Sequence, residues 1–401
     1  MTLHRDYPHL AFKKQWHLDE STNILLGQCE AYVDAIANTP ILPEYYRNLM
    51  EVALTKGAQA TTAIEGNTLT EDEVKRVHQG QKLPESREYL GIEVKNILEA
   101  FTQVLNETVF QDKQQLIDDN LILRFHKMVG MGLGEHFAAI PGQFRKADVI
   151  VGPYKAPDYR DVPELAEQYC SFLKKEFRFE DGHQRYRDVI IQAIVAHIYL
   201  EWIHPFSDGN GRTGRLLEFY ILSRGGYPDI VLHVLSNHYN QTRTEYYRQI
   251  NAAYVARDLS EFIRYALTGF RDGAASVLQT IRQSQLRITW QHYIYSKFAG
   301  VEFKQKEVFK RKRNLALALP IDRKFRLEEI PDLNTKLARI YGGISELTLK
   351  RDLQELIQLQ IVKERKGNYF CNIIVLYQMM ATQKNKTAEF LGHLEGEDFL
   401  V

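Results

Sequence analysis

The chain of 401 residues is too long for one ordinary compact domain, and we expect two or three domains with a substantial core. Lys plus Arg equals Asp plus Glu at 51 each, so the formal net charge is zero, which argues against a chain-wide surface for nucleic acid or anionic membrane. The three cysteines form no C-x-x-C pair, which argues against a disulfide framework or a zinc knuckle. Without an apolar signal core or a run long enough to span a bilayer, the sequence predicts a cytoplasmic protein with no membrane contact.

Helical periodicity dominates the chain up to about residue 360, and a mainly α fold is therefore predicted. A capping box at Thr70–Glu73 opens one of the predicted helices. The predicted helix at 187–202 is apolar nearly all round, which is typical of a helix at the centre of a bundle. Helices are expected at residues 43–64, from 70 onward, and at 86–106, 116–129, 162–177, 187–202 and 216–223.

One segment departs from the helical pattern. Residues 142–165, GQFRKADVIVGPYKAPDYRDVPEL, contain a short alternating apolar run followed by Gly, Pro and Tyr. This pattern predicts a small β-hairpin between helices, within Phe144–Pro157.

The composition changes near the basic run 304-KQKEVFKRKRN-314, which we interpret as a solvated helix face. Beyond it, residues 325–370 predict three short helices and a strand pair joined at Lys366-Gly367-Asn368, which is the plan of a winged helix-turn-helix. The expected organisation is an N-terminal helical region (1–100), a catalytic core (101–272), a helical linker (273–320), a winged-helix domain (321–375) and a C-terminal tail (376–401).

The stretch 204-HPFSDGNGRTGR-215 follows the apolar helix and has the composition of a cradle for a charged ligand. Gly209 and Gly211 flank Asn210, so the backbone can turn its N–H groups toward one point at the start of a helix, where an anion binds well. Arg212 and Arg215 are three residues apart and share a helix face. Two guanidinium groups beside such a nest suit a polyphosphate.

Two further residues of this stretch could carry chemistry. Asp208 is an oxygen ligand of the kind that holds Mg²⁺ together with phosphates, and His204 could accept a proton from an attacking hydroxyl. Each residue also has a simpler explanation, because a histidine at a helix end is often structural and an aspartate before Gly-Asn-Gly is often a helix cap.

Position for position, the stretch matches H-x-F-x-[DE]-G-N-G-R-x-x-R, and the chain thereby resembles the Fic-domain proteins. The resemblance implies a helical Fic fold that transfers AMP from ATP to a Tyr, Thr or Ser hydroxyl of a target protein and releases pyrophosphate. It implies His204 as the general base, Phe206 as a core anchor of the loop, and Asp208 as the ligand of Mg²⁺.

The same resemblance implies an ATP site along the loop. Arg212 would contact the phosphates and Arg215 would reach the γ-phosphate. The family variant that transfers phosphate carries lysine at the second glycine, so Gly211 favours AMP transfer. The loop residues implied in ATP binding are His204, Gly209, Asn210, Gly211, Arg212, Thr213, Gly214 and Arg215.

Two other segments extend the resemblance. The predicted hairpin is similar to the Fic flap, which aligns the target segment by backbone pairing. An aromatic pair in TEYYRQINAAY suggests Tyr246 near the adenine, while Tyr254 stands where some relatives have an asparagine that reads the base. Helix packing is the alternative for both tyrosines. The flap residues expected against the nucleotide are Val151, Gly152, Pro153 and Tyr154.

A third segment, 61-TTAIEGN-67, matches the inhibitory pattern [ST]-x-x-x-E-[GN] of the same family through Thr61, Glu65 and Gly66. A carboxylate in the last turn of a helix opposes the helix dipole, so Glu65 either faces water or has found a cation. The resemblance implies that this cation is Arg215, so that Glu65 reaches into the ATP site and holds ATP in an unproductive pose. The alternative is an exposed glutamate beside a capping glycine.

The sequence of the C-terminal module does not decide between DNA and protein as its partner. Lys350 and Arg351 on the expected recognition helix, and a basic wing, would suit DNA phosphates, whereas interspersed acidic residues favour protein docking. The interpretation as an AMP-transferring enzyme thus has two alternatives. The chain could be an ATP-sensing, DNA-binding regulator, or the same site could remove AMP from a target. Self-modification and self-association are further expectations from the resemblance. The wing residues are Lys363, Arg365 and Lys366, and the acidic residues are Glu346, Asp352 and Glu355.

Overall fold

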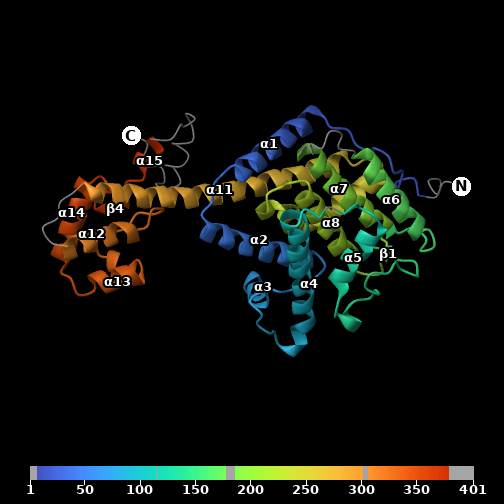
Figure 1. Ribbon diagram of the computed structural model, residues 1–401, viewed down its shortest axis with the longest axis horizontal. Helices are drawn as coiled ribbons and strands as arrows, with labels where there is room; N and C mark the ends of the chain where they lie inside the picture. The colour runs from blue at the N-terminus through green and yellow to red at the C-terminus, as the bar shows by residue number, and fades with distance from the viewer. Residues whose placement is uncertain (1–6, 114, 178–185, 301–305, 379–401) are drawn as a thin grey trace. The chain divides into compact units, whose positions relative to one another are not determined.

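The computed structural model describes residues 7–113, 115–177, 186–300 and 306–378. Contacts divide the chain into two units, Met1–Ile281 and Arg282–Val401. Both are mainly helical, and each has one short antiparallel strand pair among its described residues, which confirms the predicted fold class (Figure 1). In the part of the chain that is described, no helix combines the length and apolarity needed to cross a bilayer.

Most of the predicted helices of the first unit are present within a few residues of their expected ends. The last of them differs, because α8 begins at Asn210 rather than at Leu216 and so takes in most of the Gly- and Arg-rich stretch. Short 3-10 or π segments lie at Glu85–Arg87, Asn106–Phe110, Gly134–His136 and Asp229–Val231. The α-helices are α1 (Glu20–Ala37), α2 (Pro43–Ile64), α3 (Glu71–His78), α4 (Glu88–Leu105), α5 (Asp119–Gly130), α6 (Val162–Glu176), α7 (Tyr186–Ile203), α8 (Asn210–Arg224), α9 (Val234–Gln241) and α10 (Arg243–Ala256).

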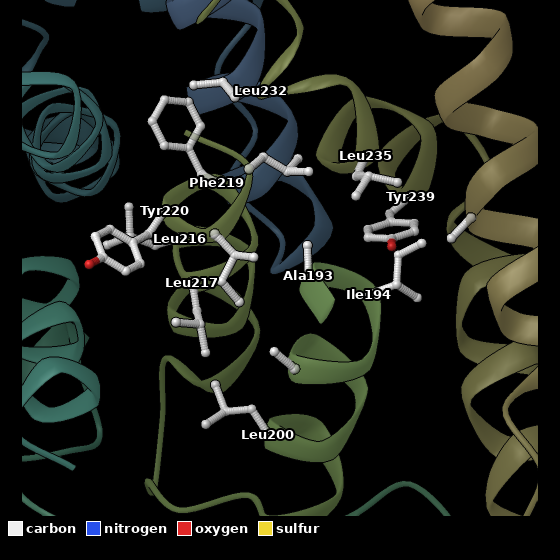
Figure 2. Packing of buried hydrophobic residues seen from close by; sticks show 14 of the residues in the cluster. Ala193, Ile194, Leu200, Leu216, Leu217, Phe219, Tyr220, Leu232, Leu235 and Tyr239 are labelled. Atoms are coloured by element: carbon white, nitrogen blue, oxygen red, sulfur yellow. The ribbon is translucent and has the colours of Figure 1, made fainter. Parts of the chain in front are cut away.

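The core of the first unit is built on the pair α7 and α8, which pack along each other. Residues 189–200 of α7 are buried without exception, as expected for a helix that is apolar on every face. Figure 2 shows Ala193 and Leu200 of α7 on the side toward Leu217 of α8, and Ile194 of α7 beside Tyr239 of α9. The segment between these two helices is therefore held at both ends by the best-packed part of the unit.

Helix α2 crosses this core and ends at the candidate site. Pro43 occupies its first turn, where a missing N–H costs nothing, and Gly57 lets α2 approach α9 so closely that a Cβ there would lie 2.7 Å from the Cβ of His233. The helix ends at Ile64, with Glu65 as its C-cap and Gly66 at φ 102°. The close packing against α9 fixes where Glu65 lies.

The predicted hairpin is present as β1 (Ile150–Val151) and β2 (Tyr154–Lys155). The strands pair antiparallel, and the turn between them contains Gly152 at φ 56°. Ile150 is 73% exposed and Val151 is 40% exposed, so β1 presents apolar side chains to the outside. Among the described residues β1 pairs with β2 alone, which leaves its other edge open.

Helix α11 (Ser260–Ala299) carries the chain from the first unit into the second. The second unit continues with α12 (Lys306–Ala318), α13 (Thr335–Tyr341), α14 (Glu346–Gln358), β3 (Val362–Arg365), β4 (Asn368–Cys371) and α15 (Ile374–Gln378). The residues predicted as a linker contribute Trp290, Ile294 and Leu315 to the core of this unit. Lys304 and the tail from residue 379 lie outside the described residues.

The second unit has the elements that the C-terminal sequence predicts, with one correction. The first of the three short helices predicted within 325–370, over RLEEI at 326–330, does not form; a 3-10 turn at Ile330–Asp332 takes its place, because Pro331 ends the run. Helices α13 and α14 follow, and β3 and β4 form a hairpin through Lys366 and Gly367, both at positive φ. Phe325 adds a bridge to Tyr369 on the edge of this hairpin.

Candidate active site

The candidate site lies in the loop between α7 and α8, which is folded by its own side chains. Phe206 is fully buried and stacks on His126, with ring centroids 3.6 Å apart. The Asn210 amide accepts from Phe206 N at 2.9 Å and donates to Phe206 O at 2.8 Å, so the two residues clamp the turn. Gly209 caps α8 at φ 80°, and a Cβ there would lie 2.8 Å from Phe137. The first N–H groups of α8 are therefore held in place facing the site.

His204 begins the loop, in the left-handed conformation at φ 49°. Its Nδ1 lies 3.3 Å from the backbone oxygen of Glu201, which favours a proton on Nδ1 and leaves Nε2 as an acceptor. Burial lowers the pKa of His204 to about 4, so the imidazole is neutral at physiological pH. The ring therefore has the protonation state that a general base requires.

Arg145 fixes the backbone of this histidine. Its fully buried side chain donates from Nε to His204 O at 2.8 Å and from Nη1 to Ala147 O at 2.9 Å, and also contacts Pro157 O. Arg145 N donates to Pro205 O at 2.9 Å. One arginine therefore joins the hairpin region to the start of the loop.

Asp208 is the candidate magnesium ligand. Its side chain is 29% exposed, with Oδ1 accepting from Arg212 Nη2 at 2.8 Å and Oδ2 accepting from Ala138 N at 3.1 Å. No group of three His, Cys, Asp or Glu side chains in the described residues could hold a metal by itself. Mg²⁺ is commonly bound by one or two carboxylates together with substrate phosphates, so a single partly exposed carboxylate beside the start of α8 fits this ion.

Arg212 is paired on two sides. Nη2 donates to Asp208, and Nη1 donates to Glu93 of α4 at 2.6 Å. The Glu93 carboxylate also accepts from Asn67, which follows the end of α2. With 4% of its surface exposed, Arg212 is an ordered cation at the edge of the loop rather than a free side chain.

Arg215 is almost completely buried, at 1% exposed. Its Nε donates to Thr61 Oγ1 at 2.7 Å, and Nη2 donates both to Thr61 O at 3.0 Å and to Glu65 Oε1 at 2.6 Å. Burial opposes ionisation of Glu65, but the charge and hydrogen bond of Arg215 outweigh it and lower the pKa of the carboxyl. The end of α2 therefore supplies a charged partner for the second arginine of the loop.

The same carboxylate lies over the start of α8. A Cβ built on Gly211 would lie 2.2 Å from Glu65 Oε1 and 2.9 Å from Arg215 Nη1. Position 211 therefore accepts only glycine while Glu65 is in this place. The point toward which the nest and the helix dipole are directed is filled by an anionic side chain of the chain itself.

Two more acids lie behind the ion pair. Burial, and secondarily the Glu65 charge, raise the pKa of Glu201 to about 8, and burial raises the pKa of Glu218 well above its usual range. Oε1 of Glu201 and Nη1 of Arg215 are inaccessible to solvent and have no hydrogen-bond partner within the described part of the chain. The site thus contains more buried ionisable groups than its hydrogen bonds satisfy, which is typical of functional sites.

The hairpin residues predicted against a nucleotide divide into two groups. Val151, Gly152 and Pro153 are exposed, as a flap would require. Tyr154 points inward instead, where its hydroxyl lies 3.0 Å from His9 Nε2 and donates to Trp202 O. Tyr254 packs edge-on against Tyr154, with ring centroids 4.9 Å apart. Tyr154 thus anchors the flap to α7, and Tyr254 of α10 packs on Tyr154.

The predicted adenine contact of Tyr246 does not fit this arrangement. Tyr246 is 1% exposed, its hydroxyl is 2.7 Å from His197 Nε2, and its ring stacks on Tyr239. Its neighbour Tyr247 is 45% exposed and lies at the end of α2, with its hydroxyl 3.4 Å from Ile64 O. The packing alternative therefore fits the surroundings of Tyr246, and Tyr247 is the exposed ring of the pair.

Sequence reasoning missed several residues of the site. Glu93 and His126 come from helices that carry no motif, and their roles depend on packing that the sequence does not reveal. Arg145 could have been noticed as a lone cation at the start of the predicted hairpin, and Glu201 as the one charge near the end of an otherwise apolar helix. The loop residues themselves lie together as the spacing predicted.

In a comparison with known protein families, residues 116–222 match the Fic/DOC family. Protein adenylyltransferase fic-1 of Caenorhabditis briggsae is 32% identical over 213 residues, which cover 51% of this chain and 37% of that protein. Protein adenylyltransferase Fic of Culex quinquefasciatus is 30% identical over 238 residues, covering 58% of this chain and 43% of that protein. The chain thus spans about two fifths of the length of these relatives.

Solved structures give the same picture of the fold. A Fic family protein from Desulfovibrio desulfuricans G20 superposes with a TM-score of 0.55 at 19% identity, over 90% of this chain and 98% of that one. A Fic-1 fragment from Caenorhabditis elegans superposes with a TM-score of 0.53 at 25% identity, over 65% of this chain and 73% of the fragment. The first likeness extends over nearly the whole chain and concerns the fold alone.

Proposed function

From the match of residues 116–222 to the Fic/DOC family, we propose that this chain is a Mg²⁺-dependent protein adenylyltransferase. It transfers AMP from ATP to a Tyr, Thr or Ser hydroxyl of a target protein and releases pyrophosphate. The observation that carries the proposal is the convergence of a neutral imidazole, a partly exposed carboxylate and the glycine-rich start of α8 within one loop. The relatives named above as adenylyltransferases support the same reaction class.

The chemistry assigned to His204 is general-base catalysis. Nε2 takes the proton of the target hydroxyl while the oxygen attacks the α-phosphorus of ATP. The new P–O bond forms as the bond between the α-phosphorus and the bridging oxygen breaks, and pyrophosphate leaves. Arg145 acts through the backbone of His204 by holding the ring where it can accept the proton.

The phosphates bind at the start of α8. The N–H groups from Gly209 to Gly211 and the helix dipole stabilise the negative charge that develops on the leaving oxygens. Arg212 supplies a cation at one edge, and Asp208 would hold Mg²⁺ together with the phosphates. An ion held by Asp208 would supply positive charge against the transferring and leaving groups.

The flap aligns the target segment with the site. The β1 strand has an open edge and exposed apolar side chains, so an extended target segment can pair with it as an added strand. Backbone pairing places the target hydroxyl with little dependence on the flanking sequence.

Glu65 restrains the enzyme. Its carboxylate occupies Arg215 and the space above Gly211, which are the two places where the γ-phosphate end of ATP would bind. ATP therefore binds poorly or in a pose that does not align the α-phosphate for attack. Release requires movement of the end of α2, so the restraint is a switch in which one ion pair replaces another.

The test is incubation of the purified protein with Mg-ATP, followed by intact mass measurement for added AMP. We expect wild type to gain little, Glu65→Gly to gain AMP on its own hydroxyls, and Glu65→Gly with His204→Ala to gain none. Calorimetry should find ATP binding largely retained in the double variant, because His204 serves the proton transfer rather than the phosphates. No added AMP in Glu65→Gly, on itself or on proteins of a cell extract, would overturn the proposal.

A further inference from the structure

The zero net charge of the chain conceals a division between its two units. Residues 1–281 carry 30 Lys and Arg against 37 Asp and Glu, a net charge of −7. Residues 282–401 carry 21 against 14, a net charge of +7. The second unit is thus a basic module attached to an acidic one, and such an asymmetry between parts of a chain points to an anionic partner for the basic part.

Of the acidic residues of α14 that argued against an anionic partner, Asp352 is buried, and Glu355, with 44% of its side chain exposed, is held in an ion pair. Asp352 is 1% exposed and accepts from Arg311 at 2.7 and 3.0 Å and from the Tyr341 hydroxyl at 2.8 Å. Glu355 pairs with Lys312, which is itself 6% exposed. These carboxylates hold α12 against α14 and are neutralised there. Glu346 remains exposed, in the first turn where the helix dipole favours it.

The outward face of α14 has a different character. Its exposed residues after the first turn recur at helical spacing and comprise two cations and two amides: Lys350, Arg351, Gln354 and Gln358. Strand β3 and the turn after it add a second group of exposed cations, with Glu364 as the acid among them: Lys363, Arg365 and Lys366. These seven residues, four on α14 and three at the hairpin, are called the basic face below.

We propose that the basic face binds double-stranded DNA, with α14 in the major groove and the β3–β4 hairpin on the adjacent backbone. The order α13, glycine-bearing turn, α14, hairpin is that of a winged helix-turn-helix, whose second helix reads the groove. Arg and Lys pair with guanine edges and Gln with adenine edges, and the hairpin cations suit phosphates. Protein interfaces are instead depleted in Lys and rich in aromatic residues, and the exposed face of α14 has Leu347 as its large apolar side chain.

The test is fluorescence anisotropy of a labelled mixed-sequence duplex of about 30 base pairs, long enough for several helical turns, titrated with the full chain. We expect saturable binding that weakens steeply with salt, because each phosphate contact contributes a slope of about −0.9 in log K against log salt. Lys350→Glu with Arg351→Glu should weaken binding at least about tenfold and reduce the slope by about two. Circular dichroism would verify that this variant folds, since both side chains are exposed.

The matched control is Lys174→Glu with Lys175→Glu, on exposed residues of α6 in the first unit. It changes the net charge of the chain equally, and we expect duplex binding within about twofold of wild type. No binding by the wild-type chain at low salt would overturn the proposal and leave protein docking as the role of this face. Equal losses in the two charge-reversed variants would also overturn it, since binding would then follow total charge. The assay requires no ATP, so its result is independent of the adenylyltransferase proposal.

Discussion

Glu65 Oε1 lies 2.6 Å from Nη2 of Arg215, and the two residues are separated by 150 positions in the chain. Arg215 is 1% exposed, whereas about a third of the Glu65 side chain is open to solvent. The cation is therefore fixed and the anion is the member that can leave. A buried guanidinium that loses one carboxylate must find another anion, and under the proposed function the phosphates of ATP are that anion.

Replacing Glu65 should release the enzyme. In Glu65→Gly, Arg215 and the space above Gly211 become available to ATP, and we expect a rise in adenylylation of roughly 5- to 150-fold, the range of typical couplings between sites. The measurement is incorporation of radiolabelled AMP into the protein itself and into proteins of a cell extract. Glu71→Gln, at an exposed glutamate in the first turn of α3, is the control and should behave as wild type. Equal labelling of all three proteins would contradict the restraint.

A substitution at Gly211 tests phosphate binding separately from release of the Glu65 restraint. In a Glu65→Gly background the clash with Glu65 Oε1 is gone, but a methyl at position 211 still lies against the Arg215 guanidinium at the start of α8. We expect Gly211→Ala in that background to lose at least about tenfold in ATP affinity, a loss of about 1.4 kcal/mol. Calorimetry of Mg-ATP binding measures it. Unchanged affinity would show that the phosphates bind elsewhere.

The fold was largely predictable because its signal is local. Periodicity predicted most helices to within a few residues, and the glycine and proline of the hairpin predicted its turn. The exceptions have local causes too. At RLEEI a proline outweighed the helical pattern, and α8 began early because Gly209 in the left-handed conformation can cap a helix directly at Asn210. The extent of each unit depends on which faces pack together, and a linear pattern contains little of that information.

For the candidate site, sequence was sufficient where the chemistry lies within one loop and insufficient where it depends on distant partners. The spacing within 204–215 predicted that His204, Asp208 and the nest lie together. It could not reveal that Arg212 is held by Glu93, which in turn accepts from Asn67, or that Tyr246 is enclosed by His197 and Tyr239. Aromatic side chains at helical spacing look alike whether they face a ligand or a core, so burial had to be observed.

The depressed pKa of His204 predicts an unusual pH profile. Because burial lowers this pKa to about 4, the neutral base is already dominant at pH about 5, and protonation stops the reaction only below that. In Glu65→Gly we expect kcat/KM for self-adenylylation to be flat between pH about 5 and 8, where an ordinary histidine would give a rise centred near 6.5. Single-turnover rates across this range measure it, with His204→Ala as the blank at least about 100-fold lower. A rise centred near pH 6.5 would mean that His204 is solvated when it reacts.

Glu201 predicts a dependence of stability on pH. Its folded pKa is raised from 4.5 to about 8, chiefly by burial, so the native carboxyl holds a proton that the unfolded chain releases above pH about 4.5. The native state is therefore favoured most below that pH, and the advantage is lost as pH rises toward about 8; between pH 6 and 8 the loss is about 2 kcal/mol. Urea unfolding of wild type and Glu201→Gln at several pH values measures it. The amide cannot ionise, so the variant should be less sensitive to alkaline pH, retaining the part due to Glu218, and its stability relative to wild type should rise with pH. Parallel pH profiles for the two proteins would mean that Glu201 is charged in the native state and that Arg215 is shared between two carboxylates.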